Sequence, residues 1–270
     1  MNLVFAGNYK VFKGMLLSAL SVIKHYKGEL HLYILTMELK EVDPDYLAVK
    51  NEDIFLLEKV IKEVNGASTV TKIDATDLFL KELRDSPNND TRYTAYTLLR
   101  LLVDLIPNIP DKALYLDTDV LAHHDISGFY NTDISEYELA GVKDRYGRFF
   151  MGPRYLNAGV LLLNMKRIKE TGLFLKTRNY LNTKKVFLSD QTAINKFVLK
   201  KKLMSRIYNE QKKVTKDTVI RHFSMQFRLF PKFHFINIKP WHKEKLHHVY
   251  KCHAFDDILE KYEHITKEIL

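Results

Sequence analysis

The chain alternates short apolar runs with longer segments of helical pattern, and few folds accommodate that alternation. Apolar runs of strand length occupy residues 2–6, 31–35, 70–73, 113–116, 139–142 and 159–163. Between the first two runs, apolar side chains recur at the i, i+3, i+4 and i+7 positions of one helix face, at Leu16, Ala19, Leu20 and Ile23. Further helices are predicted at about residues 53–64, 93–105, 166–181 and 190–199. Short buried strands that alternate with helices predict an α/β fold, in which helices flank a mostly parallel sheet on both faces.

Length and composition fit such a domain and indicate the compartment in which it works. With 270 residues, 46% of them hydrophobic, the chain can bury a sizeable core. Cys252 is the only cysteine, so no disulfide can form within the chain and a reducing compartment is expected. The N-terminus lacks the basic start and apolar stretch of a signal peptide, and no window holds the roughly 18 apolar residues of a spanning helix. We therefore expect a cytoplasmic protein that is not integral to a membrane.

The basic charge of the chain is open to two interpretations. A net charge of +9 attracts phosphates, nucleic acid or an anionic membrane face, but an ordinary lysine-rich surface accounts for it equally well. Residues 218–243 contain no acidic residue and interleave Lys and Arg with Phe and Trp. This combination is typical of segments that lie at a membrane interface, although a packed loop fits it too. A short amphipathic tail at about 244–268 closes the chain.

Two carboxylates follow the apolar run 113–116. Asp117 and Asp119 flank Thr118, and alternate side chains of an extended segment face the same way. In open α/β sheets, ligands bind at the carboxyl ends of strands. Two convergent carboxylates there suit a hard divalent cation that also binds phosphate oxygens. A polar turn after a strand would explain the triplet as well.

Two further polar segments adjoin predicted sheet or helix ends. Asn157-Ala158-Gly159 precedes an apolar strand, where small residues permit close approach of a ligand and an amide can bond sugar hydroxyls. Ser189-Asp190-Gln191 opens a predicted helix, with Ser189 as its N-cap and Asp190 at the positive end of the dipole. Each segment has a sufficient structural explanation, as a turn and as a helix cap. Asp190 and Gln191 could instead point at a sugar.

Basic and histidine side chains near the C-terminus could complete a phosphate site. His222 could provide another ligand for a metal ion, and Lys239 could neutralise a diphosphate. A lone histidine is more often a structural residue.

Taken in order, these segments resemble the family 8 retaining glycosyltransferases, such as bacterial lipopolysaccharide galactosyl- and glucosyltransferases and glycogenin. The resemblance runs from Phe5 to His242 and rests on LYLDTD, YLNAGVLLLN, SDQTAIN, HF and KPWH. It implies a GT-A fold, that of nucleotide-diphospho-sugar transferases, over residues 1–243, followed by a helical tail at 244–270. It also implies Mn²⁺, with Mg²⁺ as the alternative, held by Asp117, Asp119 and His222.

The same resemblance implies the activity and the remaining site residues. The activity is retaining transfer of galactose or glucose from a UDP-sugar to a saccharide acceptor, in cell-surface glycan assembly. Donor contacts are implied for Ala6, Asn8, Tyr9, Arg100, Thr118, Asp144, Asn157, Ala158 and Lys239. Asp190 and Gln191 are the implied catalytic residues.

The chain departs from the family pattern at two places. Ala6-Gly7 stands where acidic residues usually precede the nucleoside-binding Asn8-Tyr9, so recognition of the base is open. An insertion at 224–238 separates His222 from Lys239, which makes His234 a competing metal ligand. The basic, aromatic insertion also suggests a lipid-linked acceptor and peripheral contact with an anionic membrane.

Retention of configuration leaves two mechanisms open. Double displacement needs a carboxylate nucleophile, and with Asp117 and Asp119 assigned to metal this leaves Asp190 and Asp144. We favour a same-face substitution in which the diphosphate assists the acceptor and Gln191 stabilises the cationic sugar.

Three other functions compete with this assignment. The segment Leu116 to Val120 partly fits the Asp-x-Asp signature of haloacid-dehalogenase-type phosphatases, but it lies deep in the chain and lacks a downstream acidic pair at a strand end. A nucleic-acid-binding protein is disfavoured because no RNA-binding motif is present. An inactive glycosyltransferase-like binding protein is the third alternative.

Overall fold

The computed structural model describes residues 1–89, 95–228 and 234–267. Its centre is a seven-stranded sheet in the order β3-β2-β1-β4-β7-β6-β8. The strands are β1 (Asn2–Ala6), β2 (His31–Thr36), β3 (Thr69–Asp74), β4 (Lys112–Leu116), β6 (Leu139–Lys143), β7 (Leu156–Asn164) and β8 (Lys201–Leu203). Only β7 runs against its neighbours, so the mostly parallel sheet is confirmed.

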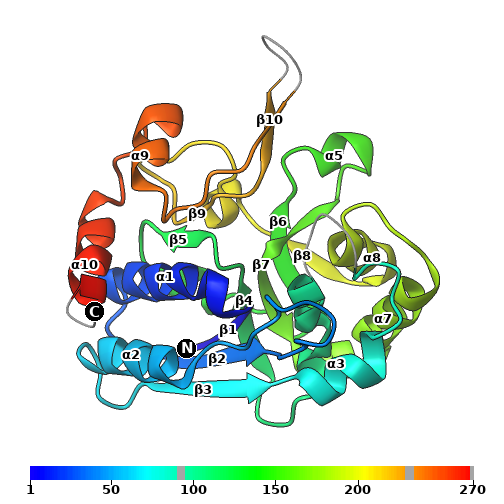
Figure 1. The fold of residues 1–270 in the computed structure, drawn as a ribbon. Helices are drawn as coiled ribbons and strands as arrows, with labels where there is room; N and C mark the ends of the chain where they lie inside the picture. Colours follow the sequence, from blue (N-terminus) through cyan, green and yellow to red (C-terminus); the bar gives the residue numbers. More distant parts are fainter. Residues whose placement is uncertain (90–94, 229–233, 268–270) are drawn as a thin grey trace.

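Helices cover both faces of this sheet (Figure 1). Along β1, Leu3 and Phe5 point into one apolar core while Val4 and Ala6 point into the other, as the two-residue period of a strand requires. The first core is closed by α1 (Phe12–His25) and α2 (Asn51–Lys62). The second is closed by α3 (Thr76–Leu83), η2 (Ala95–Leu105), α6 (Met165–Thr171), α7 (Leu173–Thr183) and α8 (Ser189–Phe197).

Two predicted helices differ in detail from the observed ones. The segment predicted as a helix over 93–105 is a 3₁₀ helix from Ala95 to Leu105, and residues 93 and 94 lie outside the described part. The single helix predicted over 166–181 is two helices, α6 and α7. Gly172 separates them with a left-handed φ of 66°, a conformation that glycine adopts without strain.

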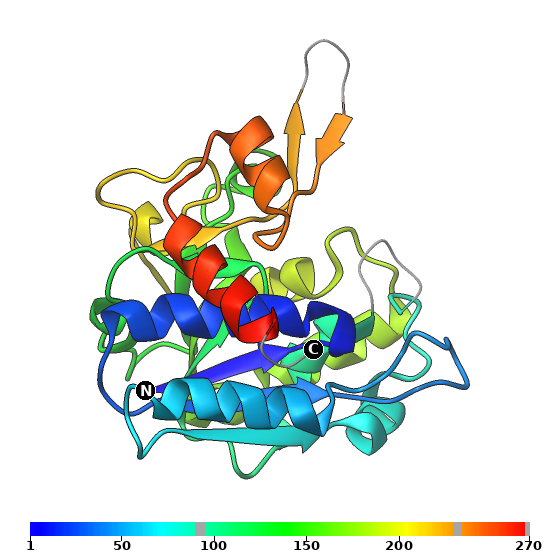
Figure 2. The ribbon, with the colours of Figure 1, turned by 60° about the vertical axis from the view of Figure 1, so that its left-hand side comes forward.

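Smaller elements lie above the carboxyl edge of the sheet. β5 (Val120–Ala122) pairs antiparallel with β9 (Ile220–His222), and η3 (Arg206–Asn209) adjoins them. β10 (Gln226–Arg228) and β11 (His234–Ile236) form a hairpin that points away from the body in both views (Figures 1 and 2). Short helices α4 (Ser127–Tyr130) and α5 (Gly147–Phe150) lie in the connections, with η1 (Tyr9–Val11) before α1.

The C-terminal segment is helical and packs on the main body. It comprises α9 (Lys243–Lys245), the π-helical turn η4 (Leu246–Tyr250) and α10 (Asp256–Lys267). Ile258 and Leu259 of α10 join the core around α1, and Lys24 pairs with Asp257 at 2.6 Å. Figure 2 shows α10 lying across α1. Among the described residues, no helix is both long and apolar enough to cross a membrane.

Candidate functional site

The pairing of β5 with β9 brings residues from distant parts of the sequence together. Asp117 follows β4, and its backbone N–H donates to the Gly159 carbonyl at 2.8 Å. A turn then leads into β5, in which Val120 pairs with His222 of β9. Phe223 N–H donates to the Asp119 carbonyl at 2.9 Å. The loop with both aspartates therefore faces His222.

Three ligand atoms from these residues converge. His222 Nε2 lies 3.2 Å from Asp119 Oδ1 and 3.7 Å from Asp117 Oδ2. Of the histidines, the structure brings His222 to the two carboxylates; His234 lies exposed on β11. Asp119 and His222 are buried, whereas Asp117 is partly exposed. The set of one imidazole and two carboxylates, with a side open to solvent, suits a divalent metal ion.

Two asparagines orient the imidazole. His222 Nδ1 lies 3.1 Å from Asn157 Oδ1 and 3.2 Å from Asn209 Oδ1. The amide of Asn157 is itself fixed, because its Nδ2 donates to the Asp144 carboxylate at 2.9 Å. Nδ1 therefore carries a proton, and Nε2, which faces the two carboxylates, either carries a second proton or binds a metal ion. Three acceptor atoms at one point require a cation between them, either a proton or a metal ion.

Gly159 allows His222 and Asp117 to approach each other closely. A Cβ placed on it would lie 2.3 Å from His222 Cε1 and 2.6 Å from Asp117 Oδ2. Because neither neighbour can move without leaving the cluster, any side chain at 159 would intrude on the ligands. The residues present thus fit a bound divalent ion in their chemistry and in the convergence of their ligand atoms.

Buried charges around the cluster are paired with opposite charges. Lys239 Nζ lies 2.5 Å from Asp119 Oδ2. Burial opposes ionisation of Asp119, but Lys239 and His222 outweigh it and hold the pKa of this carboxyl well below its usual range. Asp119 is therefore ionised at any pH at which the protein would work.

Arg100 of η2 contacts both Asp117 and Asp190. It donates to Asp117 Oδ1 at 2.9 Å and to the Ala158 carbonyl at 2.6 Å, and its Nε lies 3.0 Å from Asp190 Oδ2. Tyr115 also donates to Asp117 Oδ1, at 3.0 Å. Burial raises the pKa of Asp190 to about 6, although Arg100 acts in the opposite direction. Arg100 thus links Asp117 to Asp190 of α8. We refer to Asp117, Asp119 and His222 below as the metal cluster.

The polar residues predicted to contact the sugar form one network. Asn157 Nδ2 also donates to Gln191 Oε1 at 3.2 Å, and Gln191 Oε1 accepts from Ala158 N–H at 2.9 Å. Asp144 accepts from the backbone N–H groups of Tyr146 and Gly147. The structure therefore brings Asp144, Asn157, Ala158 and Gln191 together beside the metal cluster.

Gly7, which follows β1, lies close to the loop that carries Asp117 and Asp119. A Cβ on Gly7 would lie 3.7 Å from Thr118 Cγ2, so Gly7 adjoins this loop, and its chain neighbours Ala6 and Asn8 are buried. Tyr9 donates to Asp45 Oδ1 at 3.4 Å, and Lys10 pairs with the same carboxylate. An acidic residue thus does lie near Asn8-Tyr9, although it comes from a later loop.

Two details of the site were wrong or missed at the sequence level. The predicted N-cap role of Ser189 is wrong: Leu188 occupies the cap position with φ 56°, and the Ser189 hydroxyl is buried without a hydrogen-bond partner. Asn209 was missed, although it orients His222. Its only signal in the sequence is its place in the polar triplet Asn209-Glu210-Gln211.

Comparison with known sequences settles the class. The chain matches the model of glycosyl transferase family 8 over residues 2–245. The chain belongs to glycosyl transferase family 8. Members of this family with this fold generally depend on a divalent metal, and the phosphatase alternative is not favoured.

Curated family relatives are longer than this chain. A putative glycosyltransferase of Haemophilus influenzae is 25% identical over 193 residues, which cover 67% of this chain and 54% of the relative. Glycosyltransferase GlyA of Streptococcus pneumoniae is 35% identical over 109 residues, covering 40% of this chain and 15% of GlyA. The chain thus spans about half or less of these relatives.

Solved structures confirm the GT-A fold. The galactosyltransferase LgtC, solved with donor and acceptor sugar analogues, superposes with a TM-score of 0.66 at 18% identity, covering 99% of this chain and 96% of LgtC. GlyE of Streptococcus pneumoniae superposes with a TM-score of 0.65 at 18% identity, covering 96% of this chain and 63% of GlyE. At these identities the similarity establishes the fold alone.

Proposed function

We propose that this family 8 protein is a retaining hexosyltransferase that moves galactose or glucose from a UDP-sugar to a saccharide acceptor. The observation that carries the proposal is the cluster of Asp117, Asp119 and His222, whose close approach the missing side chain of Gly159 allows. Mn²⁺, or Mg²⁺ in its place, would be held there and would act as a Lewis acid on the leaving diphosphate.

The surrounding residues divide into three groups in this proposal. Lys239, next to Asp119, supplies positive charge where the leaving group becomes negative. Ala6, Asn8, Tyr9 and Thr118 border the nucleoside side, and Asp45 is added as a neighbour of Tyr9. Arg100, Asp144, Asn157, Ala158, Asp190 and Gln191 border the sugar side.

The hydrogen bonds of Asp144 and the ion pair of Asp190 support same-face substitution over double displacement. Asp144 uses one carboxylate oxygen for two backbone N–H groups and the other for Asn157. Asp190 is buried, and its Oδ2 lies 3.0 Å from Arg100 Nε. Neither carboxylate is free to attack an anomeric carbon without breaking these contacts. Trapping a covalent sugar adduct on Asp190 or Asp144 would overturn this part of the proposal.

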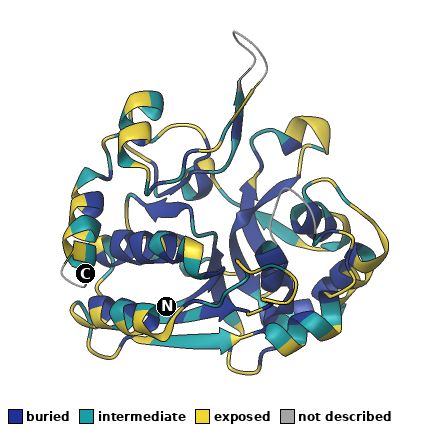
Figure 3. Cartoon of the chain, viewed as in Figure 1, coloured by how far each residue is buried: buried dark blue, intermediate teal, exposed yellow. Residues whose placement is uncertain are grey.

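We also propose that the acceptor is reached at an anionic membrane on its cytoplasmic face, as part of cell-surface glycan assembly. The hairpin β10–β11 and helix α5 both extend from the body on the side above the sheet (Figures 1 and 3). Exposed apolar side chains lie on them or next to them, at Phe149, Phe150, Met151 and Phe235. Exposed aromatic groups on a basic protein favour an interfacial position. Flotation with phosphatidylglycerol vesicles at low salt tests this, and protein that stays unbound contradicts it.

Donor hydrolysis tests the main proposal. The purified protein is incubated with UDP-glucose, UDP-galactose, UDP-N-acetylglucosamine or GDP-mannose, with Mn²⁺ or with EDTA, and release of the nucleoside diphosphate is followed. We expect Mn²⁺-dependent turnover of UDP-galactose or UDP-glucose. Turnover of another donor would change the sugar assignment. No turnover, together with no metal-dependent binding of UDP in calorimetry, would overturn the transferase proposal for this chain.

A further inference from the structure

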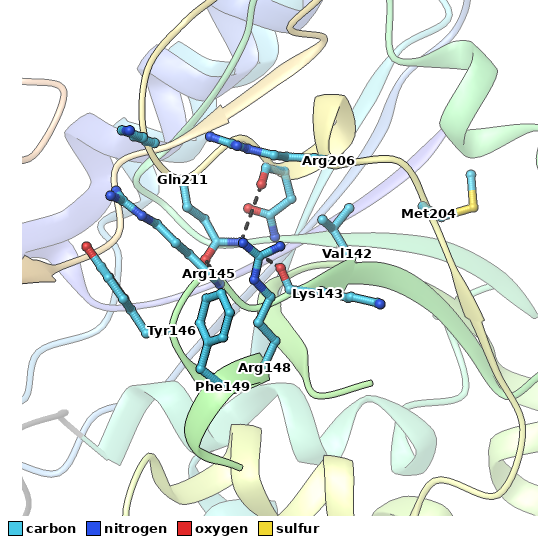
Figure 4. Close-up of a pocket in the computed structure, with 11 residues that line it drawn as sticks. Val142, Lys143, Arg145, Tyr146, Arg148, Phe149, Met204, Arg206 and Gln211 are labelled. Atoms are coloured by element: carbon cyan, nitrogen blue, oxygen red, sulfur yellow. Dashed lines mark hydrogen bonds between the residues drawn. The ribbon is translucent and has the colours of Figure 1, made fainter. Parts of the chain in front are cut away.

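A basic hollow of about 410 Å³ lies next to the candidate site (Figure 4). One wall is the segment that follows β6, and the other is the connection between β8 and β9. Five basic residues line it: Lys143, Arg145, Arg148, Arg206 and Lys212. None of its lining residues is acidic. Figure 4 shows Arg206 on one side of this basic hollow and Arg148 on the other.

Most of this positive charge has no counter-charge in the described part of the protein. Arg206 pairs with Glu210 at 2.7 Å. The other four side chains have no described carboxylate within 4 Å, and Arg145 Nη1 is a buried atom without a hydrogen-bond partner. Arg145 and Arg148 instead lie against the aromatic rings of Tyr146 and Phe149. Gathered cations of this kind attract an oxyanion, and arginine forks match phosphate oxygens in pairs.

The basic hollow has a fixed floor that it shares with the candidate site. Gln211 Oε1 accepts from Arg145 N–H at 2.9 Å, and its Nε2 donates to the Lys143 carbonyl at 3.3 Å. Asn209 lines the hollow and also contacts His222 Nδ1 and Asn157 Oδ1. Asn209 therefore both lines the basic hollow and contacts a residue of the ligand cluster.

We propose that the basic hollow binds a phosphate group carried by the acceptor saccharide. This inference rests on the proposed transferase function, because it needs an acceptor. The donor's diphosphate does not fill the hollow in this assignment, since the metal cluster and Lys239 already receive it. A neutral saccharide would leave four unpaired cations next to the reaction. The acceptor class is thus a phosphorylated glycan rather than a neutral one.

Calorimetry with matched ligands tests the proposal on the full chain, in the presence of UDP and Mn²⁺. The probes are galactose 1-phosphate, glucose 1-phosphate and lactose 1-phosphate, each compared with its free sugar and with inorganic phosphate. We expect at least one sugar phosphate to bind about tenfold or more tightly than both its free sugar and phosphate alone, as for a gained charge-assisted hydrogen bond. Equal affinity for phosphorylated and free sugars would overturn the proposal.

Two pairs of substitutions test whether the preference for the sugar phosphate depends on the basic hollow. Arg145→Gln with Arg148→Gln removes two charges from the basic hollow, whereas Arg154→Gln with Lys213→Gln removes two exposed charges outside its lining. Only the first pair is expected to abolish the preference for the sugar phosphate, and thermal unfolding checks that both variants fold. Equal loss in both pairs would mean a general charge effect and would overturn the assignment.

Two other outcomes would show that the basic hollow binds free phosphate or a lipid headgroup instead of a phosphorylated acceptor. Inorganic phosphate that binds as tightly as the sugar phosphates would make the basic hollow a phosphate-ion site. Binding only of phosphatidylglycerol vesicles, lost in the first variant pair, would make it a headgroup site. Either result overturns an acceptor subsite. Donor hydrolysis is measured separately, so failure of the transferase function is distinguished from failure of this inference.

Discussion

The metal cluster and the basic hollow both contact Asn209, yet they differ in how their charges are arranged. In the cluster each buried charge has an opposite charge beside it: Arg100 joins Asp117 and Asp190, and Asp119 joins Lys239 and His222. In the basic hollow, like charges gather, and they are more exposed to solvent.

Burial explains the difference. A charge removed from water is costly unless a partner is fixed in place, so the cluster is paired before any ligand arrives. Cations at an open surface repel one another weakly, because water and salt screen them. The cluster is therefore preorganised, whereas the basic hollow obtains its counter-charge from a ligand. The four predictions below test this contrast, from the largest effect to the smallest.

The largest effect is expected from Asp119→Asn. The substitution removes one ligand oxygen's charge and leaves Lys239 and His222 without their shared carboxylate. We expect Mn²⁺-dependent donor turnover to fall by more than about 100-fold, beyond the roughly 10- to 100-fold typical of residues that only support a metal ligand. Donor hydrolysis and Mn²⁺ calorimetry measure it, with exposed Asp217→Asn as the control. Turnover within a few-fold of the wild type would mean that Asp119 is not a ligand.

A smaller loss is expected from Gly159→Ala, which tests whether space as well as charge defines the cluster. The added Cβ would lie 2.3 Å from His222 Cε1 and must displace it or Asp117. We expect Mn²⁺ affinity to drop about 10- to 100-fold, and the free energy of unfolding to fall by about 1–3 kcal/mol. Gly66→Ala is the matched control, because a Cβ there meets no atom within 4 Å. Unchanged Mn²⁺ affinity in Gly159→Ala would contradict the assigned ion position.

The raised pKa of Asp190 predicts a pH dependence of stability for the metal-free protein. Because the pKa is about 6 in the folded chain and lower in the unfolded chain, the folded state binds more protons between them. The stability from this group is fully present below about pH 4 and is lost as the pH rises through about 6, by on the order of 2–3 kcal/mol. Urea unfolding in EDTA measures it.

Asp190→Asn is the comparison for that experiment, since every other titrating group is retained. The difference in free energy of unfolding between wild type and variant should change across this pH range in favour of the variant. A constant difference would show that Asp190 titrates at its ordinary pKa and that burial does not control it.

The smallest effect is expected from salt, which separates exposed from buried charge. Raising the salt from about 0.1 M to about 1 M shortens the screening length from about 10 Å to about 3 Å. The affinity for the sugar phosphate should fall several-fold, because the basic hollow is open to solvent. Arg145→Gln with Arg148→Gln should remove this dependence. An equal salt dependence in wild type and variant would break the contrast between the two regions.

Local pattern was enough to predict the mostly parallel sheet. The strands 2–6, 31–35 and 113–116 and the face of α1 follow directly from apolar periodicity, because a residue's exposure in a strand or helix depends on its near neighbours. The family resemblance rested on such short segments too, and the family match confirmed it.

What the tertiary structure decided lies between segments that are distant in sequence. The pairing of Val120 with His222 made His222 and not His234 the neighbour of the aspartates. Gly159 became the residue that lets His222 and Asp117 come together, and Asn209 became the group that orients the imidazole. The basic hollow gathers charges from two separate connections. None of these has a local signature, because distances between side chains far apart in the chain are set only when the strands that carry them pair and the core is packed.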